Sequence, residues 1–195
     1  AERRRLMLSM LTEEPDAYLA QLQAAKLNDD VEVAHYAATA VAQISKESDL
    51  KLQQLERAFK TDPSAQNLNE YCDFLGEYLG SGLAEGRVAQ IQRQQYARLL
   101  ARRCEREDTL ELRIRYATAL ADVGQIDEAQ AVIDQLVLDV PEEQEVWMLC
   151  LRLAVMRRDG DEVHRVIDAI DKQYVYLSAA NREELAFWRN GEEAR

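Results

Sequence analysis

Residues 124–141 read GQIDEAQAVIDQLVLDVP, and part of this segment recurs 34 residues later. Residues 161–163, DEV, fall on 127–129, DEA, and the apolar Ile167 falls on Ile133. A repeat of this length, with a small residue between two apolar helices, predicts helical hairpins stacked in a row. Such an array presents a groove that binds other proteins, so the pattern favours a scaffold and leaves its partner unnamed.

The composition fits this expectation. The chain has 195 residues, of which 47% are hydrophobic, and the seven glycines and three prolines suit a mostly helical protein. The net charge is −12, so the protein as a whole repels nucleic acid and acidic lipid, and neither is an expected partner. No apolar run approaches the ~18 residues that a membrane helix needs.

The cysteines number three, and no Cys or His spacing matches a metal site. Cys72, Cys104 and Cys150 are therefore expected to be reduced and half-buried in a cytoplasmic setting, the alternative being one disulfide and one free thiol. His35 and His164 have no ligand partner at metal-site spacing and are expected to pack or to face solvent.

Other features that resemble catalytic motifs have structural explanations. The carboxylate pairs, such as Glu142 with Glu143, stand at expected helix starts, where they meet the positive end of the helix dipole. Gly76, Gly80 and Gly82 are not followed by the lysine of a phosphate loop. The sequence thus predicts no enzyme and no catalytic, cofactor or metal site.

Hydrophobic periodicity indicates a succession of helices, and no long segment alternates as a strand does. One helix is expected around Leu19 and Leu22, and Asn28-Asp29-Asp30 is expected to break it and cap the next. Later helices are expected over 31–44, 50–61, 68–79, 85–107, 109–122, 126–139, 142–158, 160–171 and 178–190.

The segment 110–170 resembles two tetratricopeptide repeats, 32–63 resembles a weaker third, and 66–107 a distorted fourth. The 78 residues from Pro63 to Pro141 exceed two repeats by ten, so the middle hairpin is expected to be longer. The resemblance implies an all-α, right-handed superhelix of about four antiparallel hairpins over 16–177, with a capping helix at 178–195.

In this family, the first helices of the hairpins line the groove. The resemblance therefore implies ten protein-binding positions with aromatic, methionine and mixed charged side chains: Tyr36, Gln43, Glu70, Phe74, Glu77, Tyr78, Thr118, Asp122, Arg152 and Met156.

A narrower resemblance covers 30–40, 50–56 and 71–83, which are similar to the cytoplasmic repeat domain of PelE-like proteins. These proteins carry membrane helices before the repeats and are encoded with the machinery for Pel-type exopolysaccharide. The resemblance implies a scaffold that gathers a cytoplasmic glycosyltransferase and a cyclic-dinucleotide receptor at the inner membrane.

The N-terminus agrees with such a parent protein. The chain starts at Ala1 and its first methionine is Met7, as in a domain excised from a longer protein. The arginines of the leader, 1–15, match the cytoplasmic flank of a membrane helix, which predicts a cytoplasmic domain tethered through a segment missing from this chain. A solvated helix start is the alternative interpretation.

An arginine-rich segment, 86–106, reverses the charge of this acidic chain locally. Arg98, Arg102 and Arg106 are spaced by four and are expected to form one stripe on a helix. The stripe is either a solvated face paired with acidic neighbours or a docking strip for an acidic partner. Nucleic acid is disfavoured because no aromatic residue shares the stripe.

Three functions remain open from the sequence. The first is a non-catalytic scaffold of the exopolysaccharide complex, and the second is a soluble repeat adaptor in an unrelated pathway. The third is a domain that binds an anionic nucleotide or polysaccharide through the arginine stripe.

Overall fold

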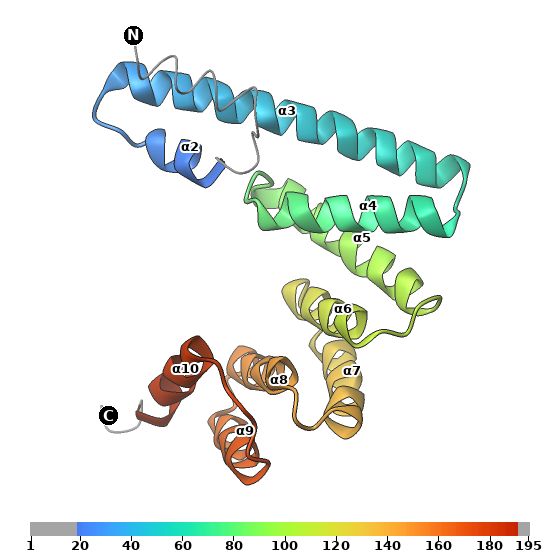
Figure 1. Ribbon diagram of the computed structural model, residues 1–195, viewed down its shortest axis with the longest axis vertical. Helices are drawn as coiled ribbons and strands as arrows, with labels where there is room; N and C mark the ends of the chain where they lie inside the picture. The colour runs from blue at the N-terminus through green and yellow to red at the C-terminus, as the bar shows by residue number, and fades with distance from the viewer. Residues whose placement is uncertain (1–18, 191–195) are drawn as a thin grey trace. The chain divides into compact units, whose positions relative to one another are not determined.

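The computed structural model describes residues 19–190, and the predicted leader 1–15 and the residues after 190 lie outside this range. All regular structure in the described range is helical, which confirms the all-α repeat fold. Its helices (Figure 1) are α2 Leu19–Ala25, α3 Val31–Thr61, α4 Ala65–Gly80, α5 Gly86–Cys104, α6 Leu110–Asp122, α7 Ile126–Asp139, α8 Gln144–Arg157, α9 Gly160–Lys172 and α10 Ala179–Asn190.

The chain divides into two compact units between Gln92 and Arg93, a point within α5. Unit 1 contains α2, α3, α4 and the start of α5, and unit 2 contains the rest. Within the described residues, none of the helices combines the length and apolarity needed to cross a bilayer.

One expectation for unit 1 is wrong: 32–63 is no hairpin. The helices expected over 31–44 and 50–61 are one continuous helix, α3, of 31 residues. The intervening segment, Ser45–Asp49, contains neither glycine nor proline, so nothing interrupts the hydrogen-bond ladder. The predicted start is right, because Asp30 caps α3 by accepting from the N–H of Glu32 at 3.0 Å.

The continuous α3 serves both of its neighbours in unit 1. Leu19 and Leu22 of α2 pack with Ala40 and Ile44 in its N-terminal half. The C-terminal half lies along α4, where the rings of Phe59 and Tyr71 are 6.2 Å apart. α3 therefore holds unit 1 together by packing against two shorter helices (Figure 1).

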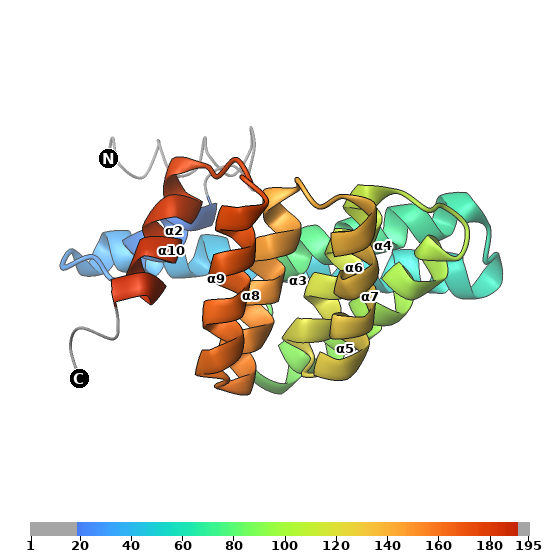
Figure 2. The same ribbon diagram turned by 90° about the horizontal axis from the view of Figure 1, so that it is seen from below.

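Unit 2 contains the two hairpins with the closest repeat match. α6 and α7 are antiparallel, and Arg113 at the start of α6 pairs with Asp139 at the end of α7 at 2.6 Å. α8 and α9 form the next hairpin, as Figure 2 shows. Ala129 and Ile133 are fully buried in the first hairpin, and Val163 and Ile167, their counterparts, are buried in the second.

The C-terminal helix α10 packs against the second hairpin. Leu185 is 3% exposed and Trp188 packs against the same cluster, whereas Phe187 is 66% exposed, and a capping role for α10 stays a prediction. The side-chain oxygen of Gln144 accepts from the N–H of Ser178 at 2.8 Å and from the amide of Asn181 at 3.0 Å. Gln144 thereby ties the start of α8 to the start of α10.

Candidate functional site

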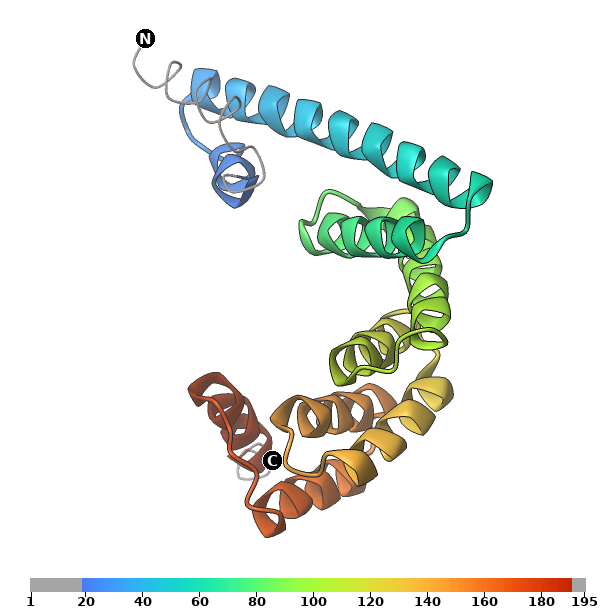
Figure 3. The ribbon, with the colours of Figure 1, turned by 45° about the vertical axis from the view of Figure 1, so that its right-hand side comes forward.

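The first helices of the unit 2 hairpins, α6 and α8, lie on one face with α10 beside them, and α7 and α9 lie on the other (Figure 3). The α6, α8 and α10 face carries a hollow of about 500 Å³. We call it the α8 hollow, and its main lining residues are Ile114, Thr118, Glu145, Met148, Arg152 and Glu184.

Helical spacing explains why α8 dominates this hollow. Glu145, Met148 and Arg152 are separated by three and four residues, so they share one face of the helix. The next face inward carries Leu149, which is 8% exposed and joins the core of the α6–α7 hairpin. The packing of that core fixes which α8 side chains face the hollow.

The charges of the α8 hollow are unbalanced. Arg152 pairs with Asp122 of α6 at 2.5 Å, so its positive charge is already compensated. Neither Glu145 nor Glu184 has a cationic partner among residues 19–190. The hollow therefore offers two uncompensated carboxylates beside the apolar Met148, a combination that complements a basic and apolar segment.

The predicted groove positions of unit 2 are divided. Thr118 and Arg152 line the α8 hollow, and Asp122 adjoins it through its ion pair with Arg152. The Thr118 hydroxyl donates to the carbonyl oxygen of Ile114 at 2.8 Å. Met156 is 43% exposed at the end of α8 and does not line this hollow.

Two of the positions predicted on α4, Phe74 and Tyr78, contact α3. Tyr78 is 5% exposed, and its hydroxyl donates to Asp49 at 2.8 Å. The ammonium of Lys51 lies 4.2 Å from the centre of the Phe74 ring. The uninterrupted α3 thus contacts this aromatic face of α4, and a protein-binding role of Phe74 and Tyr78 stays a prediction.

The environment of Tyr78 also changes its acidity. Burial, and then the hydrogen bond and charge of Asp49, raise the pKa of Tyr78 to about 12. The hydroxyl therefore remains a neutral hydrogen-bond donor at physiological pH, which suits a role in packing α4 on α3.

The remaining predicted positions of unit 1 are on the surface or near it. Glu70 and Gln43 are exposed and bonded within their own helices, to Gln66 at 2.9 Å and Glu47 at 2.6 Å respectively. Glu77 is exposed, and Tyr36 is half-buried with its ring 6.1 Å from that of His35. These positions lie in a different unit from the α8 hollow and are not assigned to it.

The α10 contribution to the α8 hollow was missed from the sequence. Ser178, Asn181 and Glu184 line it, and Gln144 holds Ser178 and Asn181 there through its two hydrogen bonds. Met148 and Glu145 were also missed, although their spacing from Arg152 was a usable signal. The approach of α10 had no such signal, because it depends on contacts 34 and 37 residues apart.

The arginine stripe is shorter than predicted. Arg98 and Arg102 lie on α5, but α5 ends at Cys104, so Arg106 follows the helix in a turn. The N–H of Arg106 donates to Arg103, three residues back, and this tightening takes Arg106 out of the regular four-residue stripe.

The cysteines are all thiols, with Cys72 buried and Cys104 and Cys150 half-buried. Burial raises the pKa of Cys150 to about 12 and also raises that of Cys104. Since the thiolate is the reactive form, neither sulfur is poised for nucleophilic chemistry at neutral pH. Among residues 19–190 no cluster of His, Cys, Asp and Glu has the geometry to hold a metal ion.

Comparison with known proteins supports the repeat architecture. Residues 83–153 match the profile of the tetratricopeptide repeat family, a segment that extends from before α5 into α8. No curated protein and no solved structure matches the chain. The family match covers a little over a third of the 195 residues and supports a tetratricopeptide-repeat domain, a type of domain that serves protein–protein interaction.

Proposed function

We propose that this chain is a non-catalytic scaffold that binds a partner protein in the α8 hollow. The observation that carries the proposal is the pair of uncompensated carboxylates, Glu145 and Glu184, beside Met148. A partner segment that fits has an apolar side chain flanked by lysine or arginine. Leu149, which lines the hollow and also belongs to the buried core of the α6–α7 hairpin, holds α8 in place at this site.

We further propose that the scaffold serves the cytoplasmic side of a membrane-anchored complex that makes a Pel-type exopolysaccharide. Its partners would be a glycosyltransferase and a cyclic-dinucleotide receptor of that complex. The support is the resemblance of 30–40, 50–56 and 71–83 to PelE-like proteins. Hydrophobic segments upstream of Ala1 in the full gene are required by this proposal, and a gene without them would contradict the anchor.

Co-purification with the two named partners tests the scaffold. The double variant Glu145→Lys with Glu184→Lys should lose the partner that binds the α8 hollow, because the two new lysines would repel the basic residues of the partner segment. The control is Asp168→Lys on α9, which makes one such charge reversal at an exposed position outside the hollow, and it should retain the partner. Equal retention by the double variant and the control would contradict binding at this site.

A further inference from the structure

A second hollow lies in unit 2 where α5, α6 and the start of α7 meet, and it encloses about 350 Å³. Its lining includes Arg98 of α5, Tyr116 of α6, Val123 at the end of α6, and Gln125 and Glu128 at the start of α7. We call it the α5 hollow. It shares no lining residue with the α8 hollow.

The repeat itself explains why this hollow is open. Thirty-four residues after Val123, Gln125 and Glu128 come Arg157, Asp159 and Glu162. Arg157 reaches α7, where its guanidinium donates to Gln130 at 3.1 Å and pairs with Asp127 at 3.2 Å. The long side chain of Arg157 thus bridges the gap between α8 and α7. In the preceding repeat, the short Val123 stands at the same position and leaves the corresponding gap open.

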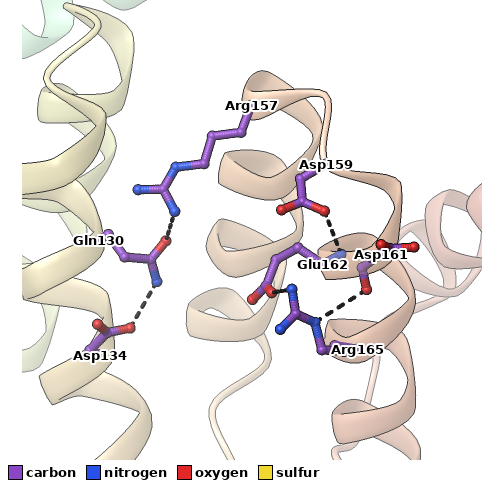
Figure 4. Close-up of polar contacts among 7 residues, drawn as sticks. All are labelled: Gln130, Asp134, Arg157, Asp159, Asp161, Glu162 and Arg165. Atoms are coloured by element: carbon purple, nitrogen blue, oxygen red, sulfur yellow. Dashed lines mark hydrogen bonds and ion pairs between the residues drawn. The ribbon is translucent and has the colours of Figure 1, made fainter.

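Polar groups in the bridged gap are satisfied internally, as Figure 4 shows. Gln130 donates to Asp134 at 2.8 Å, and Glu162 pairs with Arg165 at 2.6 Å. Asp159 accepts from the N–H of Glu162 at 2.9 Å. The bridged gap therefore has little need of an external ligand.

Arg98 is in the opposite situation. It forms no ion pair or hydrogen bond through its side chain with any residue of the described range, 19–190. By contrast, several arginines of unit 2 each pair with a carboxylate: Arg113, Arg152, Arg157, Arg165 and Arg189. The helix that carries Arg98, α5, contains no acidic residue to compensate it.

Tyr116 adds a neutral donor to the hollow. Burial raises the pKa of Tyr116, and the nearby Cys104, Glu128 and Glu105 raise it further. Its hydroxyl is therefore protonated at physiological pH. Glu128 disfavours an anion in the hollow, because its carboxylate is negatively charged. This carboxylate accepts a hydrogen bond from the amide of Gln125 at 3.3 Å.

We propose that the α5 hollow is a docking site for an acidic segment of a partner protein, one of whose carboxylates accepts hydrogen bonds from Arg98. Charge complementarity supports this occupant, because an unpaired guanidinium stands on a helix without acidic residues. The volume of about 350 Å³ lies near the lower end of the ~300–1,000 Å³ of ligand sites, so a side chain enters and not a folded module.

Binding of a fluorescently labelled poly-glutamate peptide to the chain, followed by anisotropy, tests the proposal. Arg98→Glu should weaken binding by roughly tenfold or more, since it removes a charge-assisted hydrogen bond and adds repulsion. The control Arg57→Glu makes the same charge change at an exposed position on α3 and should bind like the parent chain. Equal losses in the two variants would overturn the proposal, as would absence of binding by the parent.

A second variant separates the hollow from general electrostatic attraction. Val123→Arg adds a positive charge but should fill the hollow as Arg157 fills its counterpart, so peptide affinity should fall by roughly tenfold. Val123→Ala keeps the hollow open and should bind like the parent. Tighter binding by Val123→Arg would overturn the proposal. Circular dichroism and the melting temperature establish that each variant is folded.

Other occupants are distinguished by the same protein samples. A DNA oligonucleotide that binds in place of the peptide, with loss in Arg98→Glu, would overturn the peptide assignment in favour of a general polyanion site. A dimer in sedimentation that Arg98→Glu dissociates, without peptide binding, would assign the hollow to a second copy of the chain.

Glu128→Gln should raise peptide affinity by about two- to fivefold, since it removes a negative charge that repels the peptide. A loss of affinity would count against the assignment.

Discussion

Arg158 adopts the left-handed backbone conformation of Gly124, its counterpart 34 residues earlier, with φ of 58° at Arg158 and 80° at Gly124. The hydrogen bonds around the two residues also correspond. The N–H of Asp159 donates to Ala154 at 3.1 Å, as that of Gln125 does to Leu120 at 2.9 Å. The hairpin turn thus keeps its geometry without the glycine that normally permits it.

Arg158→Gly is expected to stabilise the chain. Left-handed backbone costs a residue with a Cβ about 1–2 kcal/mol, part of which is offset by the greater freedom of glycine when unfolded. The net gain in the free energy of unfolding should be roughly 0.5–1 kcal/mol by urea denaturation.

The reverse change provides the control. Gly124→Ala meets no atom within 4 Å, so its cost comes from backbone strain alone. It should lower the free energy of unfolding by about 1 kcal/mol. A neutral effect of both substitutions would contradict the assigned left-handed turns.

The bond between Tyr78 and Asp49 should make unit 1 sensitive to alkaline pH. The folded-state pKa of Tyr78, about 12, is above its ordinary value of 10.0, so the stability it contributes is complete below pH 10 and is lost as pH rises through 12. Tyr78→Phe should remove this loss and cost about 1 kcal/mol at neutral pH. The absorbance of tyrosinate, followed during an alkaline titration of the parent chain and of Tyr78→Phe, checks this. The prediction fails if no tyrosine of the parent chain ionises later than the ordinary ones.

Gln144→Ala is expected to loosen α10 without unfolding the hairpins. The substitution leaves the Ser178 N–H and the Asn181 amide without their acceptor, at a cost of about 1–3 kcal/mol. Hydrogen exchange should accelerate in α10 and remain slow in α6 and α7. Gln125→Ala, which removes a single exposed bond at 3.3 Å, is the matched control and should leave α10 unchanged.

Arg152 and Asp122 should contribute more to recognition than to stability. Both side chains are partly exposed, at 44% and 36%, and such pairs contribute about 0.2–1 kcal/mol. The double variant Arg152→Asp with Asp122→Arg re-forms the ion pair in the opposite orientation and should recover the stability that each single variant loses. A double-mutant cycle measures this recovery. A partner that binds the α8 hollow should bind this double variant more weakly than the parent chain, because the charges beside Thr118 have changed places.

Ile133→Ala should destabilise unit 2 by about 2–5 kcal/mol, since it leaves a cavity at a position with 0% exposure. Leu138→Ala lies five residues away on the same helix, but Leu138 is 73% exposed. Its effect should remain within about 0.5 kcal/mol. Thermal unfolding of the two variants compares them directly, and similar melting temperatures would contradict the placement of the core.

The sequence alone determined the helical hairpins of unit 2, because their signals are local. Gly124 ends α6, and Ala129 and Ile133 recur as Val163 and Ile167 after one repeat, so periodicity predicted both helices and their pairing. Thr118 and Arg152 could be placed on the lined face by the same spacing.

Tertiary structure decided what local signals leave open. The continuity of α3 turned Phe74 and Tyr78 from expected groove residues into contacts of the α3–α4 interface. The hydrogen bonds of Gln144 brought Glu184 to the α8 hollow, and the short Val123 left the α5 hollow open beside Arg98. Periodicity reports which side of a helix is buried, whereas the identity of the covering element depends on contacts between residues distant in the chain.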